Sequence, residues 1–256
     1  MGIFDSHAHY CDESFDEDRA SLLDSMKENG ISFIMEVGAG RKSSEDAVKL
    51  AGHYDFVYAS VGIHPDDTDN IGEENMDRLK ELAKNDKVRA IGEIGLDYYY
   101  EEPGREVQKK WFARQLELAK ELAMPVIIHS RDAAKDTYDI MDEHCNWENG
   151  GVIHCFSYPV EMAEKFVKKG FYVGIGGVLT FKNSKKLLEV ARLIPLENII
   201  LETDCPYMAP VPDRGQRNDS RKLKYVVEKM AEIKGISKDE VVEVTRENAL
   251  RMYGLK

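Results

Sequence analysis

The chain has 256 residues, a hydrophobic fraction of 43% and a formal net charge of −12. This length and apolar content suffice for a sizeable core, which excludes an intrinsically disordered chain. The acidic balance excludes a protein that coats nucleic acid, because a phosphate backbone is repelled at long range. No apolar run approaches the ~20 residues of a membrane span, and no secretory signal opens the chain, so we expect a cytoplasmic protein without a membrane partner.

Short β-branched or apolar runs recur along the chain and predict strands at residues 2–5, 32–37, 56–63, 88–94, 125–129, 151–155, 171–175 and 199–203. Segments with a helical apolar rhythm lie between them, most clearly residues 105–122. Nearly continuous apolar strands favour a parallel sheet covered by helices. The pattern predicts an α/β fold, a (β/α)8 TIM barrel. A doubly wound sheet is the alternative, but no G-x-G-x-x-G follows the first strand.

The end of the sequence predicts a C-terminal closing helix. Residues 236–253 open with the capping-box spacing Ser237-x-x-Glu240 and continue with apolar residues at helical intervals. No linker rich in Ser, Pro or Gly interrupts the chain, so we expect a single domain over residues 1–256. The four cysteines form no C-x-x-C pair and are expected to be reduced and mostly buried.

Histidines and carboxylates stand where the predicted strands end. In a parallel barrel these ends open onto one face, and residues two apart on a strand point to the same side. Such groups are costly near a core unless they are paired or coordinated, so their gathering predicts a divalent metal site. The candidate ligands are His7, His9, Glu93, His129, His154 and Asp204. His53 and His144 lie in helix-like segments and are expected on the surface.

Five segments together resemble one family. FDSHAHY, IGEIGLDYYY, IIHSRDA, IHCFS, and LETDCPYMAP followed by RGQRN are similar to the TatD-like metal-dependent deoxyribonucleases, a TIM-barrel branch of the amidohydrolase superfamily. The match covers nearly the whole chain. After RGQRN the chain reads Asp219-Ser220, where relatives often have Glu-Pro, which leaves the course of this loop open.

The resemblance implies that two divalent ions bind and which residues are their ligands. His7, His9, Glu93 and Asp204 would hold one ion, and Glu93, His129 and His154 the other, with Glu93 as the bridge. Asp204 would also orient or deprotonate the attacking water. The identity of the ions stays open. The family favours Mg²⁺, whereas Mn²⁺ or Zn²⁺ suit a ligand set rich in histidine.

Three further residues are candidates for substrate binding. His64 ends the third strand and could donate to a phosphate oxygen or support a ligand. Arg131 follows His129 by two residues, and its planar fork suits a phosphate, with a salt bridge at the barrel mouth as the alternative. Arg217, in the loop after the last strand, would supply local positive charge unless that loop is simply solvated.

Three tyrosines, Tyr98, Tyr99 and Tyr100, follow the fourth strand. Exposed aromatic rings there could stack on bases, as they do in proteins that bind single strands. A more ordinary role is packing of a loop against the rim, and we expect this for at least two of the three.

The sequence predicts a metal-dependent hydrolase of ester bonds, a deoxyribonuclease acting as an exonuclease on DNA ends, single-stranded above all. Its partners would be DNA ends or short oligonucleotides, with no obligate protein partner, and the protein would be a monomer. An ester or amide hydrolase such as an aminoacyl-tRNA deacylase stays open, since the same activated water attacks a carbonyl. A barrel that binds metal without turnover is the third possibility.

Overall fold

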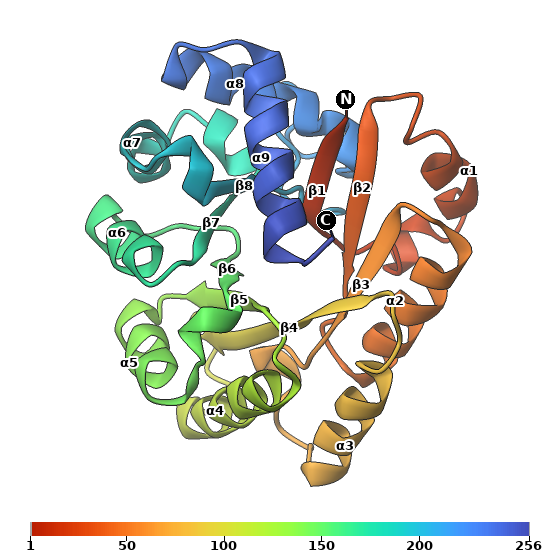
Figure 1. The fold of residues 1–256 in the computed structure, drawn as a ribbon, viewed down its shortest axis with the longest axis vertical. Coiled ribbons are helices and arrows are strands. Elements are labelled where there is room, and N and C mark those ends of the chain that lie inside the picture. The colour runs from red at the N-terminus through yellow and green to blue at the C-terminus, as the bar shows by residue number, and fades with distance from the viewer. Residues whose placement is uncertain (1, 256) are drawn as a thin grey trace. The chain divides into compact units, whose positions relative to one another are not determined.

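The computed structural model describes residues 2–255. Its strands form one parallel sheet in the order β1-β2-β3-β4-β5-β6-β7-β8, and each strand is followed by a helix (Figure 1). The strands are β1 (Ile3–Ala8), β2 (Ile31–Val37), β3 (Val57–Val61), β4 (Val88–Asp97), β5 (Val126–Arg131), β6 (Gly151–Ile153), β7 (Tyr172–Ile175) and β8 (Ile199–Leu201). This is the topology of a (β/α)8 TIM barrel, so the predicted fold class is confirmed.

The helices follow the strands in chain order. They are α1 (Arg19–Asp24), α2 (Arg41–His53), α3 (Glu73–Leu82), α4 (Arg105–Leu122), α5 (Ala134–His144), α6 (Val160–Lys168), α7 (Lys185–Leu193), α8 (Leu223–Lys234) and α9 (Lys238–Met252). Short 3₁₀ helices are η1 (Glu13–Phe15), η2 (Pro65–Asp67), η3 (Trp147–Asn149), η4 (Gly177–Thr180), η5 (Leu196–Asn198) and η6 (Ser220–Lys222). No helix among residues 2–255 is both long and apolar enough to cross a membrane.

The predicted strands are all present, but their ends differ from the prediction. β1 continues to Ala8 and β4 to Asp97, because residues beyond the predicted ends still pair with the neighbouring strand: Ala8 with Glu36, and Asp97 with Arg131. β6 and β8 end two residues before the predicted ends. The predicted helix over residues 105–122 coincides with α4.

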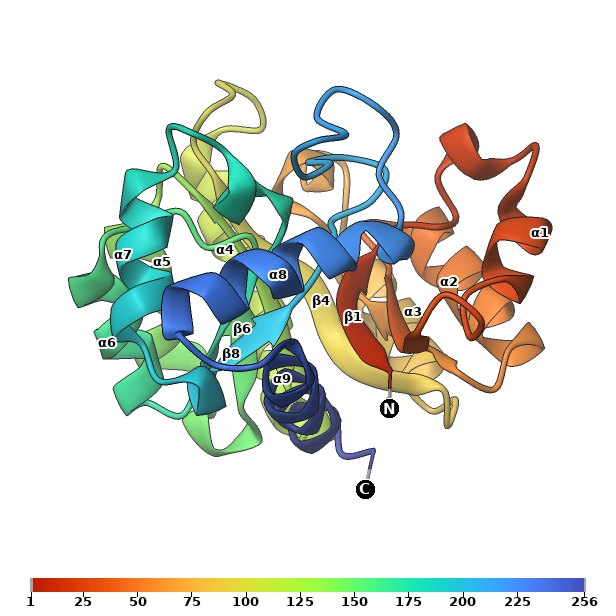
Figure 2. The ribbon, with the colours of Figure 1, turned by 90° about the horizontal axis from the view of Figure 1, so that it is seen from above.

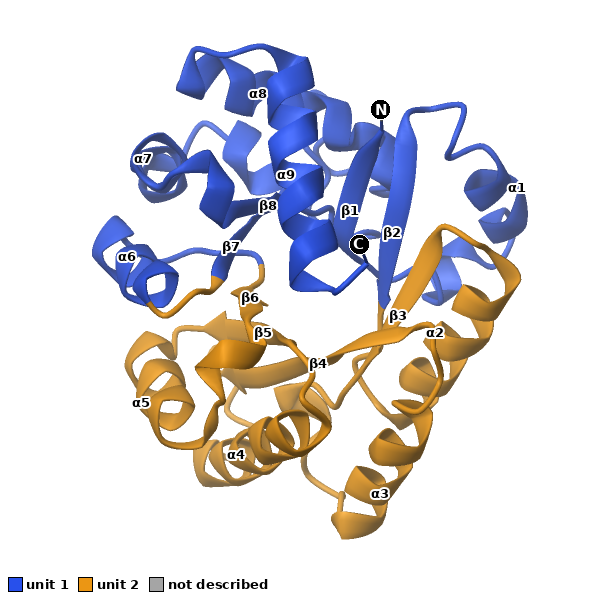
Figure 3. Cartoon of the chain, in the orientation of Figure 1, with its two compact units in different colours: residues 1–36, 155–168, 172–256 blue, residues 37–154, 169–171 orange. Residues whose placement is uncertain are grey.

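The described residues group into two compact units (Figure 3). Unit 1 comprises residues 2–36, 155–168 and 172–255, and unit 2 comprises residues 37–154 and 169–171. The single domain over residues 1–256 stays a prediction, and its two terminal residues lie outside the described part.

Unit 1 contains the closing helix. The Ser237 side chain caps α9 by accepting the Glu240 N–H at 3.1 Å. Further along the helix, the Asn248 side-chain amide donates to the Leu196 and Ile199 carbonyls, both at 2.8 Å, and the Tyr253 hydroxyl donates to the Ser6 carbonyl at 2.9 Å. α9 thereby packs on β1 and β8, with α8 beside it (Figure 2). The predicted closing helix is confirmed.

In unit 2, two glutamines of α4 hold the ends of β3 and β4. The Gln115 side chain accepts from the Ile63 N–H at 2.8 Å and donates to its carbonyl at 3.0 Å. Gln108 makes the same pair of bonds with Asp97, at 2.9 and 2.8 Å. Both glutamines are buried, so these bonds are shielded from water and fix where the strand ends lie.

All four cysteines are reduced thiols. Cys205 is buried as expected, but Cys11, Cys145 and Cys155 are only half-buried. The expectation of mostly buried thiols is therefore wrong for three of them, because each lies in a loop or at a helix end rather than inside a strand.

Candidate metal centre

A first group of metal-ligand side chains, the β1–β8 group, lies in unit 1 and consists of His7, His9 and Asp204. The two imidazole Nε2 atoms are 3.0 Å apart, and they lie 3.7 and 3.5 Å from Asp204 Oδ1. Donors that share one ion at bonds of about 2.1 Å stand roughly 3.0–3.5 Å apart. The spacing therefore suits a divalent cation.

A buried hydrogen-bond network positions Asp204. Asp5 accepts from the Thr203 N–H at 2.9 Å, the Thr203 hydroxyl at 2.7 Å and the Ser220 hydroxyl at 2.6 Å. Burial raises the pKa of Asp5 to about 7, although the hydrogen bonds from Ser220 and Thr203 oppose this shift. Asp204 itself adopts a left-handed backbone with φ of 56°, and its N–H donates to the His7 carbonyl at 2.9 Å. The bond to the His7 carbonyl thus fixes the position of Asp204 relative to β1.

The same network resolves the loop whose course the sequence left open. Ser220 bonds to Asp5, and Asp219 caps η6 by accepting the Arg221 N–H at 3.0 Å. The Asp-Ser pair is therefore used directly to anchor this loop.

Glu36 is a supporting residue that sequence reasoning missed. It is buried, and its two carboxylate oxygens accept the Tyr10 and Cys11 N–H groups, both at 2.8 Å. Burial raises the pKa of Glu36, which these backbone donors partly offset. It holds the chain immediately after His9. Its position as the one charged residue of the run ISFIMEV was the available signal.

A second group, the β4–β6 group, lies in unit 2 and consists of Glu93, His129 and His154. Glu93 Oε1 is 2.8 Å from His129 Nδ1 and 3.1 Å from His154 Nε2. Glu93 and His154 are each only 4% exposed, so an unneutralised charge here would be costly. The ligand atoms of Glu93, His129 and the neighbouring His64 all lie within 4.8 Å of one another, and such a mixed set of imidazole and carboxylate donors suits a second divalent cation.

Asp97 orients His129. It lies four residues after Glu93 on the same side of β4, and its Oδ2 is 3.0 Å from His129 Nε2. When Nε2 donates to Asp97, the Nδ1 lone pair faces Glu93, which is the carboxylate–histidine arrangement found behind many metal sites. Burial alone would lower the pKa of His129, but the hydrogen bonds to Asp97 and Glu93 raise it overall.

Gly95 allows this approach of the two strands. A Cβ at Gly95 would overlap the His129 carbonyl oxygen, and its φ of 148° disfavours other residues. The Gly-Glu-Ile-Gly-Leu-Asp run therefore brings both carboxylates of β4 against His129.

His64 is a neutral imidazole beside the β4–β6 group. Its Nδ1 accepts the Asp66 N–H at 3.2 Å and caps η2. Burial, with repulsion from His129, lowers the pKa of His64 to about 3, so the ring is neutral. A neutral imidazole that accepts at Nδ1 carries its hydrogen on Nε2. That Nε2 lies 3.7 Å from Glu93 Oε1, beside the β4–β6 group.

Arg131 lies beside the same group. Its side chain is 45% exposed, and one guanidinium nitrogen is 3.9 Å from Asp97 Oδ2, a contact that corresponds to the expected alternative of a salt bridge. Of the tyrosines in the preceding loop, Tyr98 packs, with its hydroxyl donating to Asp136 at 2.8 Å. Tyr99 and Tyr100 are 58% and 54% exposed. The expectation that at least two of the three pack against the rim is wrong.

Arg217 is already engaged within unit 1. It donates to both Asp18 oxygens, at 2.8 and 2.6 Å, and to the Ser14 carbonyl at 2.7 Å. Its guanidinium also lies 4.7 Å from the Phe15 ring centroid. These contacts tie the loop after β8 to the loop after β1, and they leave Arg217 outside the β1–β8 group.

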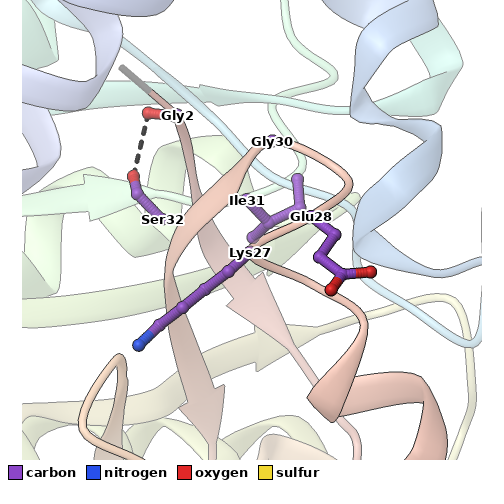
Figure 4. A pocket seen from close by; sticks show the side chains of 6 residues that line it. All are labelled: Gly2, Lys27, Glu28, Gly30, Ile31 and Ser32. Carbon is purple, nitrogen blue, oxygen red and sulfur yellow. Dashed lines mark hydrogen bonds between the residues drawn. The ribbon is translucent and has the colours of Figure 1, made fainter.

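Two histidines and one cavity do not contribute to these groups. His53 is exposed at the end of α2, and His144 ends α5 with its Nδ1 3.0 Å from Glu117, as expected of surface residues. A cavity of about 420 Å³ in unit 1 is lined by Gly2, Lys27, Glu28, Gly30, Ile31 and Ser32 (Figure 4). It opens at the start of β1, whereas His7 stands near the end of that strand.

Comparisons with known proteins identify the family of this chain. The family described as TatD related DNase matches residues 4–254. The uncharacterized metal-dependent hydrolase YabD of Bacillus subtilis is 41% identical over 98% of this chain and 98% of its own length. A 3'-5' ssDNA/RNA exonuclease TatD of Escherichia fergusonii is 30% identical over 99% of both chains.

Solved structures extend the similarity to the fold. The crystal structure of YJJV, a TatD homolog from Escherichia coli, superposes with a TM-score of 0.93 and 28% identity, covering 99% of this chain and 98% of the other. With a family match over nearly all of its length and relatives of the same extent, the chain belongs to the TatD-related DNase family of metal-dependent hydrolases.

Proposed function

We propose that this protein is an exonuclease that removes nucleotides from the 3' end of single-stranded DNA, by metal-dependent hydrolysis of phosphodiester bonds. The observation that carries the proposal is the pair of histidine and carboxylate groups whose donors stand at metal-ligand spacing. The relative named as a 3'-5' ssDNA/RNA exonuclease supports the choice of substrate and direction, and extends it to RNA.

Each group would hold one divalent ion, Mg²⁺, Mn²⁺ or Zn²⁺. His7, His9 and Asp204 would be the ligands in unit 1, and Glu93, His129 and His154 would be those in unit 2, where both imidazoles lie within 3.1 Å of Glu93 Oε1. Such ions, when bound, lower the pKa of a coordinated water and neutralise charge on phosphate oxygens. The bridging role of Glu93 stays a prediction.

The chain's own side chains supply the remaining chemistry. Asp204 is 18% exposed, so its carboxylate can accept the proton of the attacking water, while the bond from its backbone N–H to the His7 carbonyl holds the residue in place. His64 can donate its Nε2–H to a phosphate oxygen without gaining charge. Arg131 remains cationic and solvent-accessible, which suits a neighbouring phosphate.

The charge of the chain favours short substrates over long duplexes. With 47 acidic against 35 basic side chains, the net charge of −12 repels a long phosphate backbone. Affinity would therefore rest on a few nucleotides near the ligand groups. The monomeric state and cytoplasmic location expected from the sequence stay predictions.

Digestion of end-labelled single-stranded DNA tests the proposal. The protein is stripped of metal and reloaded in turn with Mg²⁺, Mn²⁺ and Zn²⁺, and Asp204→Asn is compared with Asp139→Asn, a change in an exposed α5 carboxylate paired with Lys135. Stepwise shortening of 5'-labelled strands by wild type and Asp139→Asn, but not by Asp204→Asn, is the expected result. If two ions bind and no strand is shortened, DNA is not the substrate, and cleavage of aminoacyl-tRNA esters would support the deacylase alternative.

A further inference from the structure

An exposed aromatic and cationic surface, the Tyr99–Tyr100–Arg131 cluster, lies at the end of β4 and β5. The Arg131 guanidinium carbon is 3.7 Å from the Tyr99 ring centroid and 5.8 Å from that of Tyr100. The two rings meet edge to face, with centroids 5.0 Å apart and planes at 89°. The three side chains therefore form one continuous surface.

This cluster is fixed to the β4–β6 group through Asp97. The Tyr99 N–H donates to Asp97 Oδ1 at 2.8 Å, while Oδ2 of the same carboxylate is 3.0 Å from His129 Nε2. Asp97 and Arg131 are also paired across the sheet, and the Tyr98 N–H donates to the Arg131 carbonyl at 2.9 Å. A ligand on the cluster would thus lie next to the metal-ligand side chains.

The exposure of these rings is unusual for this part of the chain. Among the described residues of unit 2, the exposed large apolar side chains are Tyr99, Tyr100 and Val107. The adjacent Tyr98, in contrast, is packed: Arg105 lies 4.3 Å from its ring centroid, and its hydroxyl donates to Asp136. The Tyr99 ring contacts Arg131 and Tyr100, and yet 58% of the residue's surface is exposed.

We propose that the Tyr99–Tyr100–Arg131 cluster is a stacking subsite for a nucleobase of single-stranded nucleic acid. The Tyr99 ring offers its open surface to the base, and Arg131 stabilises the ring and reaches the adjoining phosphate. Stacking tolerates any base, and it supplies affinity that does not depend on net positive charge. This fits a chain with a net charge of −12. The inference rests on the proposed function and specifies how the substrate of the same site is held.

Fluorescence of 2-aminopurine tests the subsite without turnover. A trinucleotide carrying 2-aminopurine is titrated with full-length protein treated with chelator, comparing wild type, Tyr99→Phe and Tyr99→Ala. Tyr225→Ala serves as the control, since this α8 tyrosine also has a cation near its ring, Lys224 at 5.0 Å. Thermal melting of each variant establishes that it is folded.

We expect quenching of the fluorescence by wild type, Tyr99→Phe and Tyr225→Ala. Tyr99→Ala should bind about tenfold more weakly and quench little, because one stacked base is lost. The binding of a trinucleotide with an abasic position in place of 2-aminopurine is measured by competition with the fluorescent trinucleotide. It should bind equally weakly to wild type and to Tyr99→Ala. Equal binding and quenching by Tyr99→Ala and wild type would overturn the subsite.

Hydrolysis separates this inference from the proposed function. If metal-loaded protein shortens DNA, and Tyr99→Ala does so with an unchanged KM, the subsite is wrong and the exonuclease stands. If no strand is shortened with any metal but quenching depends on Tyr99, the subsite stands and the exonuclease proposal fails.

Discussion

Asp5 accepts hydrogen bonds from both the backbone N–H and the hydroxyl of Thr203, at 2.9 and 2.7 Å, although 198 residues separate the two in sequence. Thr203 directly precedes Asp204, so the carboxylate of the first strand sets the position of the metal ligand that follows the last strand. The stability of the fold and the placement of this ligand therefore depend on the same buried group.

Asp5→Ala should lower the free energy of unfolding by about 3 kcal/mol, because it leaves the buried donors of Thr203 and Ser220 unsatisfied. Asp5→Asn should cost less, since its amide oxygen still accepts one of these bonds. Urea denaturation of the metal-free protein measures both changes. A loss below about 1 kcal/mol in the alanine variant would show that the network contributes little.

Asp97→Ala should weaken metal binding by the β4–β6 group about 10- to 100-fold, because His129 loses the partner that fixes its orientation. Asp97→Asn should restore part of the affinity, since the amide oxygen can still accept from His129 Nε2. Competition with a chelating dye measures the affinity, with Asp139→Asn as the control. Unchanged affinity in the alanine variant would mean that Asp97 does not position the ligand.

His64 combines a cap and a donor, and two substitutions separate these roles. His64→Asn keeps an acceptor for the Asp66 N–H but removes the Nε2–H, so we expect wild-type melting and a fall in kcat of about 100-fold. His64→Ala should lose the same activity and also about 1 kcal/mol of stability. Steady-state digestion and thermal melting are the two readouts. Full activity of the asparagine variant would exclude a donor role.

Arg217→Ala should act on stability and leave strand binding unchanged, because Asp18 and Ser14 already use its donors. We expect a fall in melting temperature of about 2 °C, with the same fall in Asp18→Ala and no further loss in the double variant. Arg131→Ala provides the comparison for binding. If Arg217→Ala weakens binding of a single strand as much as Arg131→Ala, the sequence-based interpretation of Arg217 as a substrate ligand is correct.

Burial raises the pKa of Cys145 to about 12 from 9.0. Between these values the unfolded chain releases the thiol proton while the folded chain retains it, so this group makes folding less favourable as pH rises above 9. Alkylation needs the thiolate, so native Cys145 should react with iodoacetamide at pH 8 about 1000-fold more slowly than the same thiol in urea. Peptide mass spectrometry measures the rates. Comparable rates would show that the thiol is not shielded.

The sequence predicts the elements of this fold well because strands and helices impose different apolar periods. Residues 105–122 coincide with α4, since the helical stripe and the ends of the helix are both visible in the sequence. The ends of β1 and β4 were missed because pairing with a neighbouring strand keeps polar residues such as Asp97 in the ladder. The residues near a strand end do not indicate which residues of the neighbouring strand it pairs with.

The ligand residues could be selected from residue type and position at strand ends, but their supporting contacts could not. Burial of Glu36 and Asp5 depends on loops far away in sequence, so nothing beside them indicates their partners. Arg217 had the charge expected of a phosphate ligand, and only the structure shows that Asp18 holds it. For Tyr99, exposure was the missing quantity.

The bond between Tyr253 and Ser6 joins residues 247 positions apart. At synthesis rates of about 5–20 residues per second, roughly 12 to 50 s pass on the ribosome between the appearance of Ser6 and that of Tyr253. During this time β1 can pair with β2, but its partners in β8 and α9 do not yet exist. A strand that is buried in the folded protein therefore stays without its β8 and α9 neighbours until the last part of the chain has been made.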